Sequence, residues 1–238
     1  MIVDAHAHLG DAREQAARKN VYTVLCGTDP AGAERVLKLR ECPGAVSCGL
    51  HPWNAERYDV ADMLPMIQAS PVLGEIGLDS VWTDADMGAQ RRAFRQQLEL
   101  AQSLGKPVVL HTKGMEEEIA RTIAAYDVRK LVHWYSCDEY LELYLEQDCW
   151  FSVGPDYAAN PAVQAVIRRA PLNRLLTETD GMCAVSWALG REVAPEEVEA
   201  VLRGELRAIA RAREISEAEA ERIVEENLFA FLKGQPAT

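Results

Sequence analysis

The chain has 238 residues, with 37 acidic and 25 basic side chains and a net charge of −12. Hydrophobic residues make up 48% and charged residues 26% of it, a globular composition that excludes a disordered or fibrous chain. A single core of this size buries about 70–75% of the unfolded chain's surface, so folding needs neither disulfides nor a metal. The acidity argues against a broad basic face that binds DNA nonspecifically, although a local basic pocket is compatible with it.

Short β-branched apolar runs alternate with longer amphipathic stretches from one end of the chain to the other. They predict strands at residues 2–5, 22–26, 45–49, 72–76, 107–110, 130–132, 150–153 and 175–179. They predict helices at residues 33–40, 60–69, 88–104, 116–125, 139–147, 161–169, 195–213 and 217–232. This alternation predicts an α/β fold, a (β/α)8 TIM barrel, as a single domain over residues 1–238. A doubly wound open sheet is the competing architecture, because the pattern alone does not show that the strands close.

The sequence shows neither of two patterns that would direct the chain out of the cytoplasm. Its first residues contain no basic stretch followed by an apolar run, and nowhere do 18 apolar residues follow one another. We therefore expect no signal peptide, no membrane span, a cytoplasmic location and no obligate protein partner. The cysteines form no Cys-x-x-Cys pair and are expected to be reduced and mostly buried: Cys26, Cys42, Cys48, Cys137, Cys149 and Cys183.

The histidines all lie at or just beyond the C-terminal end of a predicted strand. In a TIM barrel, these strand ends form the rim on which active sites are built. His6 and His8 are two residues apart on one strand, so they should face the barrel axis together with Asp4. Two converging imidazoles make half a metal site, and the alternative is a pair of hydrogen-bonded core histidines. The other histidines follow later strands: His51, His111 and His133.

Acidic residues at two further strand ends could complete such a site. Glu75 is surrounded by glycine and apolar residues, where a carboxylate is costly unless it is paired or binds a cation. Asp180 follows the last predicted strand and is expected to be a ligand and base, the alternative being a helix cap. Glu178 and Asp4 share the face of the ligands and would orient imidazoles, or else form ordinary ion pairs.

These segments together resemble the TatD family of metal-dependent hydrolases and deoxyribonucleases, which are TIM barrels of the amidohydrolase-like group. The resemblance spans nearly the whole chain and is carried by Asp4-Ala5-His6-Ala7-His8-Leu9, Gly49-Leu50-His51-Pro52, Gly74-Glu75-Ile76-Gly77-Leu78-Asp79, Leu110-His111-Thr112, His133-Trp134-Tyr135-Ser136 and Glu178-Thr179-Asp180. It implies a two-metal site with His6, His8 and Asp180 on one ion, His111 and His133 on the other, and Glu75 bridging them. These ligand types suit Zn, Mn or Ni, and Mg is compatible with the carboxylates.

The chain departs from the family pattern in its substrate loops. The segment 9–21 is short, so we expect one rim loop and its helix to be trimmed. Lys113 stands where family members tend to carry Arg, and Gly181-Met182-Cys183 and Leu189-Gly190-Arg191 replace the usual motifs after Asp180.

The leading hypothesis is a metal-dependent phosphodiesterase or deoxyribonuclease that acts on DNA ends or short oligonucleotides through a water activated by two metals. Asp180 would orient or deprotonate this water and Glu75 would bridge the ions. His51 would contact a substrate oxygen or protonate the leaving group, the alternative being a histidine bonded to backbone.

Other rim residues are candidate substrate contacts. Lys113 would pair with a substrate anion, although a solvated lysine fits as well. Trp53, Trp134 and Tyr157 would stack on a nucleobase or anchor their loops. A second hypothesis keeps the metals but has a small amide, lactone or phosphate ester as substrate, which the charge of −12 and the altered loops favour. A third is a metal-storing or scaffold protein without turnover.

Overall fold

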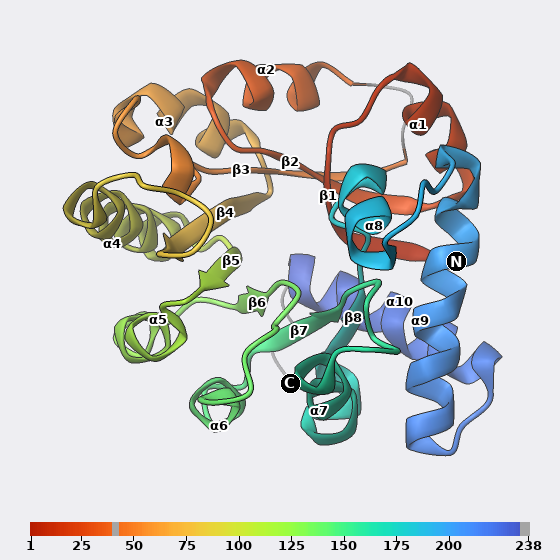
Figure 1. Ribbon diagram of the computed structural model, residues 1–238. Coiled ribbons are helices and arrows are strands. Elements are labelled where there is room, and N and C mark those ends of the chain that lie inside the picture. Colours follow the sequence, from red (N-terminus) through yellow and green to blue (C-terminus); the bar gives the residue numbers. More distant parts are fainter. Residues whose placement is uncertain (40–42, 234–238) are drawn as a thin grey trace.

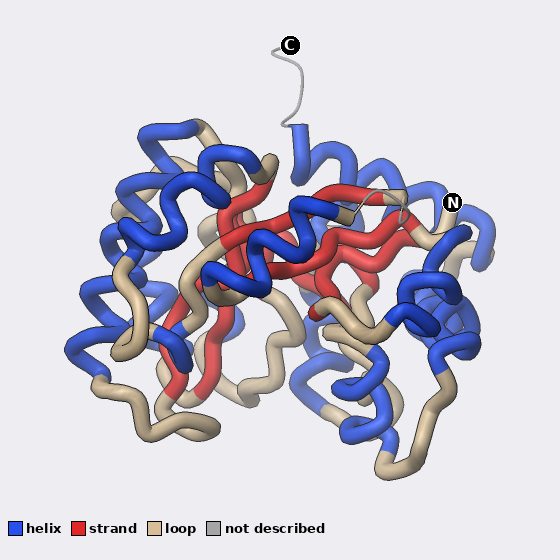
Figure 2. The backbone as a smooth tube through the Cα atoms, turned by 90° about the horizontal axis from the view of Figure 1, so that it is seen from above, coloured by secondary structure: helices blue, strands red, loops and turns tan. Residues whose placement is uncertain are grey.

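The computed structural model describes residues 1–39 and 43–233, in which eight parallel strands alternate with helices (Figure 1). The strands are hydrogen-bonded in sequence order from the first to the eighth. They are β1 (Val3–His8), β2 (Tyr22–Gly27), β3 (Gly44–Cys48), β4 (Val72–Asp79), β5 (Val108–Lys113), β6 (Lys130–Val132), β7 (Trp150–Val153) and β8 (Leu175–Thr177). Helices surround this sheet (Figure 2), which confirms the predicted (β/α)8 barrel over the doubly wound alternative.

The seam between β8 and β1 nearly closes the barrel. Thr177 Oγ1 donates to Val3 O at 2.7 Å, and the backbone N–H of Thr179 donates to Asp4 Oδ1 at 2.9 Å. The backbone N–H of Asp180 donates to His6 O at 3.0 Å. The segment after β8 is therefore held against β1, which carries two of the predicted ligands.

The helices of the described residues include two that the sequence pattern did not predict. These are α1 (Ala12–Ala17) and α8 (Met182–Leu189). α1 is too short to show a hydrophobic period, and it is followed by a 3-10 turn at Arg18–Asn20. The segment 9–21, expected to have a trimmed helix, thus contains a helix of six residues. The predicted helices appear as α2 (Pro30–Lys38), α3 (Val60–Ala69), α4 (Met87–Leu104), α5 (Glu116–Ile123), α6 (Leu141–Leu145), α7 (Pro161–Arg169), α9 (Val198–Arg213) and α10 (Glu217–Lys233).

Most differences at the element ends have local causes. α2 begins earlier than predicted because Asp29 caps it by accepting from the N–H of Gly32, and the predicted end at Arg40 lies outside the described residues, as does Cys42. α6 is shorter than predicted because Tyr140, at its start, has a left-handed backbone with φ of 64°. The first turn predicted for α9 is a 3-10 turn at Pro195–Glu197. Two further 3-10 turns lie at Pro52–Asn54 and Leu172–Arg174.

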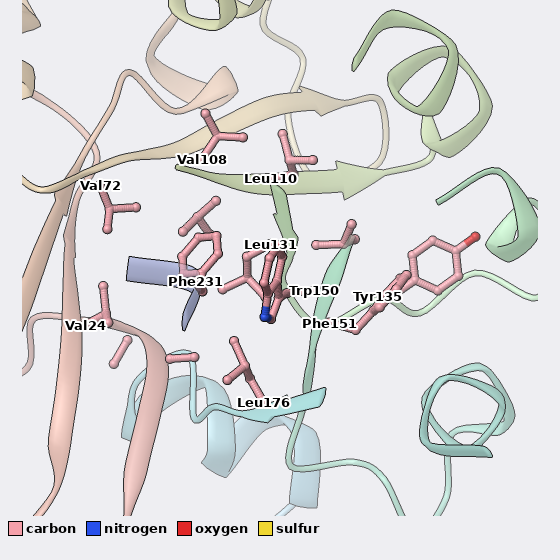
Figure 3. Close-up of a cluster of buried hydrophobic side chains, with 14 of the residues drawn as sticks. Val24, Val72, Val108, Leu110, Leu131, Tyr135, Trp150, Phe151, Leu176 and Phe231 are labelled. Carbon is pink, nitrogen blue, oxygen red and sulfur yellow. The ribbon is translucent and has the colours of Figure 1, made fainter. Parts of the chain in front are cut away.

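Apolar side chains fill the end of the barrel at the N-terminal ends of the strands, and α10 covers this end. Phe231 of α10 packs against Trp150, with ring centroids 5.7 Å apart (Figure 3). Asn227 donates from Nδ2 to the backbone oxygens of Leu172 and Leu175, which fixes α10 at the N-terminal end of β8. Since this end is closed, the opposite mouth, at the C-terminal ends of the strands, is left for a functional site. None of the described helices is long and apolar enough to cross a membrane.

Candidate metal centre

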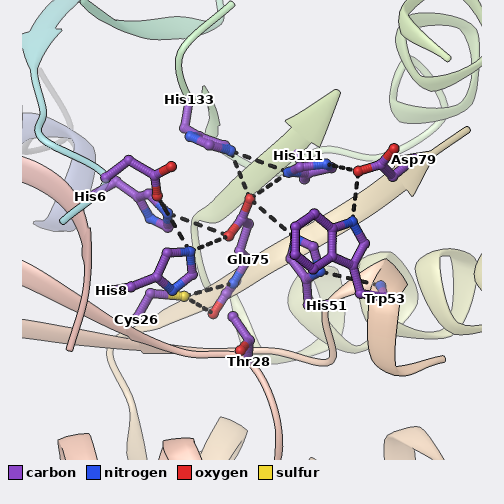
Figure 4. Close-up of polar contacts among 12 residues, drawn as sticks. His6, His8, Cys26, Thr28, His51, Trp53, Glu75, Asp79, His111 and His133 are labelled. Carbon is purple, nitrogen blue, oxygen red and sulfur yellow. Dashed lines mark hydrogen bonds and ion pairs between the residues drawn. The ribbon is translucent and has the colours of Figure 1, made fainter. Parts of the chain in front are cut away.

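The six residues predicted as ligands come together at the C-terminal mouth of the barrel (Figure 4). His6 and His8 belong to β1, Glu75 to β4 and His111 to β5. His133 follows β6 directly, and Asp180 follows β8. Six side chains from five strands thus converge, although the sequence separates them by up to 174 positions.

His6, His8, Glu75 and Asp180 form a first cluster. Nε2 of His6 lies 3.4 Å from both Glu75 Oε2 and Asp180 Oδ1. Nε2 of His8 lies 3.4 Å from Glu75 Oε2 and 3.3 Å from Asp180 Oδ1. Four atoms placed about 2.1 Å from a tetrahedral cation lie about 3.4 Å from one another, so this spacing fits a shared ion.

Three atoms of the first cluster are buried without a hydrogen-bond partner among the described residues: His6 Nε2, Glu75 Oε2 and Asp180 Oδ1. Buried polar atoms are normally paired, because leaving them unpaired costs free energy. A cation between these atoms would remove that cost. The residues present therefore fit a metal ion on structural grounds.

Glu75, His111 and His133 form a second cluster on the other oxygen of the same carboxylate. Glu75 Oε1 lies 2.7 Å from His111 Nδ1 and 2.7 Å from His133 Nε2. These two nitrogens are 3.4 Å apart. One carboxylate thus faces both clusters, with one oxygen directed to each.

Acidic residues behind the second cluster hold its imidazoles from their far sides. His111 Nε2 lies 2.9 Å from Asp79 Oδ2, and His133 Nδ1 lies 3.3 Å from Glu178 Oε1. Ser152 Oγ donates to the other oxygen of Glu178 at 2.6 Å. Such contacts fix which ring nitrogen faces the site. Glu178 thus has the orienting position expected for it, whereas Asp4 pairs with Arg18.

The electrostatics of the mouth favour ionised carboxylates. Burial tends to raise the pKa of Glu75, but the imidazoles of His133, His51 and His6 hold this pKa well below its usual range. Burial also tends to raise the pKa of Asp180, but its contacts with His6 and His8 hold this pKa below its usual value. Burial and His133 tend to lower the pKa of His6, yet Glu75 and Asp180 raise it to about 10. These carboxylates therefore carry the negative charge that a cation needs.

His51 and Trp53 line the edge of the second cluster. His51 Nε2 lies 3.5 Å from Glu75 Oε1, and its Nδ1 accepts from the backbone N–H of Trp53 at 3.2 Å. Burial lowers the pKa of His51 to about 4 despite Glu75. Trp53 Nε1 donates to Asp79 Oδ2 at 2.7 Å, and the residue is 48% exposed.

The other residues predicted to contact the substrate lie partly at the mouth and partly on the outer surface of the barrel. Trp134 is half-buried, and its Nε1 donates to Asp156 Oδ1 at 2.7 Å. Lys113 donates from Nζ to Ser136 Oγ at 3.0 Å. Tyr157 instead lines a cavity of about 470 Å³ between α7 and α9.

Some residues of the site were not predicted from the sequence. Asp79 lies two positions beyond Gly77 on the face that Glu75 shares, so strand alternation could have found it. Nothing in the sequence indicates a role for Cys26 at the site. In the structure its Sγ accepts from the backbone N–H of Glu75 at 3.2 Å. Arg18 is also buried beside the site, in the segment that was expected to be trimmed.

The comparisons with known proteins agree with this geometry. Residues 3–233 match the family model described as TatD related DNase. The metal-dependent hydrolase YcfH of Escherichia coli is 29% identical over 203 residues, which cover 75% of this chain and 77% of that protein. The 3′-5′ ssDNA/RNA exonuclease TatD of Edwardsiella piscicida is 28% identical over 191 residues, which cover 73% of this chain and 71% of that protein.

A solved structure shows the same fold. The TatD homologue YjjV of Escherichia coli superposes with a TM-score of 0.81 over 99% of this chain and 98% of that one, at 24% identity. The fold, the converging imidazoles and carboxylates and the family match over residues 3–233 point the same way. The chain belongs to the family of TatD-related DNases and is a metal-dependent hydrolase.

Proposed function

We propose that this chain is a two-metal phosphodiesterase that cleaves single-stranded DNA ends or short oligonucleotides. The observation that carries the proposal is a set of buried atoms with no hydrogen-bond partner in the described part of the chain, His6 Nε2, Glu75 Oε2 and Asp180 Oδ1, with the second cluster on the other oxygen of Glu75. The related protein named as a 3′-5′ ssDNA/RNA exonuclease supports this substrate class. We further infer a single domain of residues 1–238 that acts in the cytoplasm without an obligate protein partner.

Two divalent cations would be held by the two clusters, with Glu75 shared between them. His6, His8 and Asp180 would complete the first site, and His111 and His133 the second. The mixture of imidazole and carboxylate suits Zn, Mn, Ni or Mg. When bound, the cations would polarise the phosphoryl oxygen and lower the pKa of the attacking water.

Asp180 and His51 would act on the reacting groups from the protein side. The side chain of Asp180 is 19% exposed, so it can accept a proton from the attacking water while its Oδ1 stays buried. His51 accepts at Nδ1 from the Trp53 N–H, so in its neutral form the proton is on Nε2. This N–H would donate a hydrogen bond to a substrate oxygen. The geometry favours substrate contact over protonation of the leaving group.

Three further residues at the mouth would contact the substrate. Lys113 would pair with a phosphate next to the cleaved bond. Trp53 and Trp134 expose part of their rings near the clusters and would contact sugar or base. These contacts would bind the substrate and take no part in the proton transfers.

The test is digestion of a 5′-labelled single-stranded oligonucleotide by protein stripped of metal and reloaded with Zn, Mn, Ni or Mg. We expect cleavage with at least one metal, and a loss of more than about 100-fold in Glu75→Ala and Asp180→Asn, since each removes a charge from the site. Glu99→Ala, an exposed change on α4, is the matched control and should keep the parent's rate. No cleavage with any of the four metals would refute the proposal.

A small amide, lactone or phosphate ester is the second candidate substrate. The net charge of −12 favours it, because an acidic protein repels a long polyanion. Rates on nucleotide diesters, phosphate monoesters, lactones and N-acyl amides measured with the same metal distinguish the two candidates. The nuclease proposal requires the largest kcat/KM on the oligonucleotide.

A further inference from the structure

Three tryptophans meet above the metal centre, and two of them were not singled out in the sequence. Trp82 lies in the loop after β4, Trp134 follows His133, and Trp187 belongs to α8. The ring centroids of Trp82 and Trp187 are 5.9 Å apart at 90°, and those of Trp134 and Trp187 are 6.3 Å apart at 71°. We call these three residues the tryptophan cluster.

Two side chains of the tryptophan cluster are largely exposed to solvent. Trp82 is 51% and Trp187 is 67% exposed, so both hold large apolar surfaces in water. Their contact is edge-to-face, and both side chains keep much of their surface exposed. Contiguous exposed aromatic surface beside a catalytic mouth is typical of a binding site.

The cluster lies across the mouth of the barrel. β4 and β8 are four places apart in the eight-stranded order, so the loop after β4 and α8 approach each other from opposite sides. The rings of Trp82 and Trp187 span that gap. A chain that enters the mouth therefore passes beside them.

Two of the tryptophans share supports with the second cluster of the metal centre. The backbone N–H of Trp82 donates to Asp79 Oδ1 at 2.8 Å, and the other oxygen of Asp79 contacts His111. The backbone N–H of Trp134 donates to Ser152 Oγ at 3.3 Å, and Ser152 holds Glu178. These bonds fix the backbone of Trp82 and Trp134 relative to the proposed cleavage point.

A positive charge lies next to the cluster. Lys113 Nζ is 5.9 Å from the centroid of the Trp82 ring. Among the residues that the structure describes, Lys113 makes its polar side-chain contact with Ser136 and forms no ion pair with an acidic side chain. Exposed aromatic rings beside a cation complement the bases and phosphates of a single strand. In a chain of net charge −12, this combination is a local feature.

We propose that the tryptophan cluster and Lys113 form a base-stacking subsite for the single-stranded nucleotides next to the cleaved phosphodiester. The inference rests on the proposed nuclease function and adds to it where the bases bind. Stacking on a ring face is tolerant of base identity, so the subsite selects single strands over duplexes and abasic chains without reading sequence.

The experiment uses the full-length, metal-loaded protein with Asp180→Asn as the parent, so that binding is measured while cleavage is slow. Binding of a fluorescein-labelled dT10 and of the same chain with abasic sites is followed by anisotropy. Trp187→Ala and Trp82→Ala should each weaken binding of dT10 about 10-fold, as expected for the loss of one stacked base, and leave the abasic chain unaffected. Trp187→Phe keeps an aromatic face and should lose much less.

Leu104→Ala is the matched control, because Leu104 is 39% exposed at the C-terminal end of α4, away from the mouth. Its binding should equal that of the parent. Unchanged melting temperatures show that the variants are folded, as expected for side chains this exposed. In the background that retains Asp180, the same tryptophan changes should raise KM for dT10 while kcat changes little.

The outcomes separate the two proposals. If the wild type cleaves dT10 but Trp187→Ala and Trp82→Ala keep the parent affinity and KM, the subsite is wrong and the nuclease function stands. Equal losses on dT10 and on the abasic chain would also overturn the subsite, since the bases would not be what the rings hold. If the wild type neither binds nor cleaves dT10 with any metal, the nuclease function fails and the subsite fails with it.

Discussion

The guanidinium of Arg18 lies 2.5 Å from the carboxylate of Asp4, and the two side chains are 1% and 0% exposed. Arg18 also contacts Glu14 Oε1 at 2.8 Å and Thr179 Oγ1 at 2.9 Å. The backbone N–H of Gly181 donates to the same Thr179 oxygen. A buried ion-pair network therefore joins β1, α1 and the segment on either side of Asp180.

We predict that Arg18→Met lowers the free energy of unfolding by about 3–5 kcal/mol, because it leaves Asp4 and Glu14 buried without their cation. The measurement is urea unfolding of the metal-free protein. Lys38→Met breaks the exposed pair with Glu34, 76% and 60% exposed, and should cost less than about 1 kcal/mol. Equal effects of the two changes would show that the Arg18 network does not stabilise the barrel seam.

Nε2 of His8 faces Glu75 Oε2 and Asp180 Oδ1 in the first cluster, so the removal of this side chain should affect one ion. We predict that the wild type binds two divalent ions per chain and that His8→Ala retains fewer than two at a metal concentration that just saturates the wild type, because the first cluster loses one of its four ligands while the second keeps Glu75, His111 and His133. Elemental analysis after equilibrium dialysis gives the ratio. Two ions retained in His8→Ala would contradict the assignment of ligands to clusters.

Glu178 holds His133 from the side that faces away from Glu75. Glu178→Gln should weaken the affinity of the second site by about 10- to 100-fold, since the ring loses the anion that orients it. Competition with a chromophoric chelator measures both affinities, and the first site should be unchanged. Glu226→Gln, at a side chain 61% exposed, serves as control. The same affinity in both variants would argue against the orienting role.

The buried side chain of Glu205 should make the free energy of unfolding depend on pH. Burial, reinforced by Asp4 and Glu178, raises the pKa of Glu205 well above its usual value of 4.5. Above pH 4.5 the unfolded chain has lost this proton while the folded chain keeps it. The contribution of Glu205 to stability is therefore present below pH 4.5 and is lost as the pH rises toward the folded pKa, by at most about 1.4 kcal/mol per pH unit.

Glu205→Gln removes this titration. We predict that the variant becomes more stable relative to the wild type as the pH is raised from about 5 to 8, as measured by urea unfolding at several pH values. Glu99→Gln, at an exposed side chain, should show no such trend. Parallel pH profiles of Glu205→Gln and wild type would refute the raised pKa.

The strands that carry most of the proposed ligands run further than the sequence pattern predicts. β1, β4 and β5 end at His8, Asp79 and Lys113, each three residues beyond the predicted end. Histidine and acidic residues at a strand end look like the start of a loop in the sequence. They stay in the strand here because neighbouring strands continue the hydrogen bonding, as at His8 with Cys26 and at Asp79 with Lys113.

The sequence by itself determined the order of strands and helices, the family and the set of imidazoles and carboxylates at the strand ends. It could do so because side chains alternate along a strand and because parallel strands present their C-terminal ends at one mouth. Only the tertiary structure decided how Glu75 divides its two oxygens, why Asp4 pairs with Arg18, and that Trp82 meets Trp187. Those contacts join segments far apart in the chain, and their distances follow from barrel closure and packing, which no local pattern encodes.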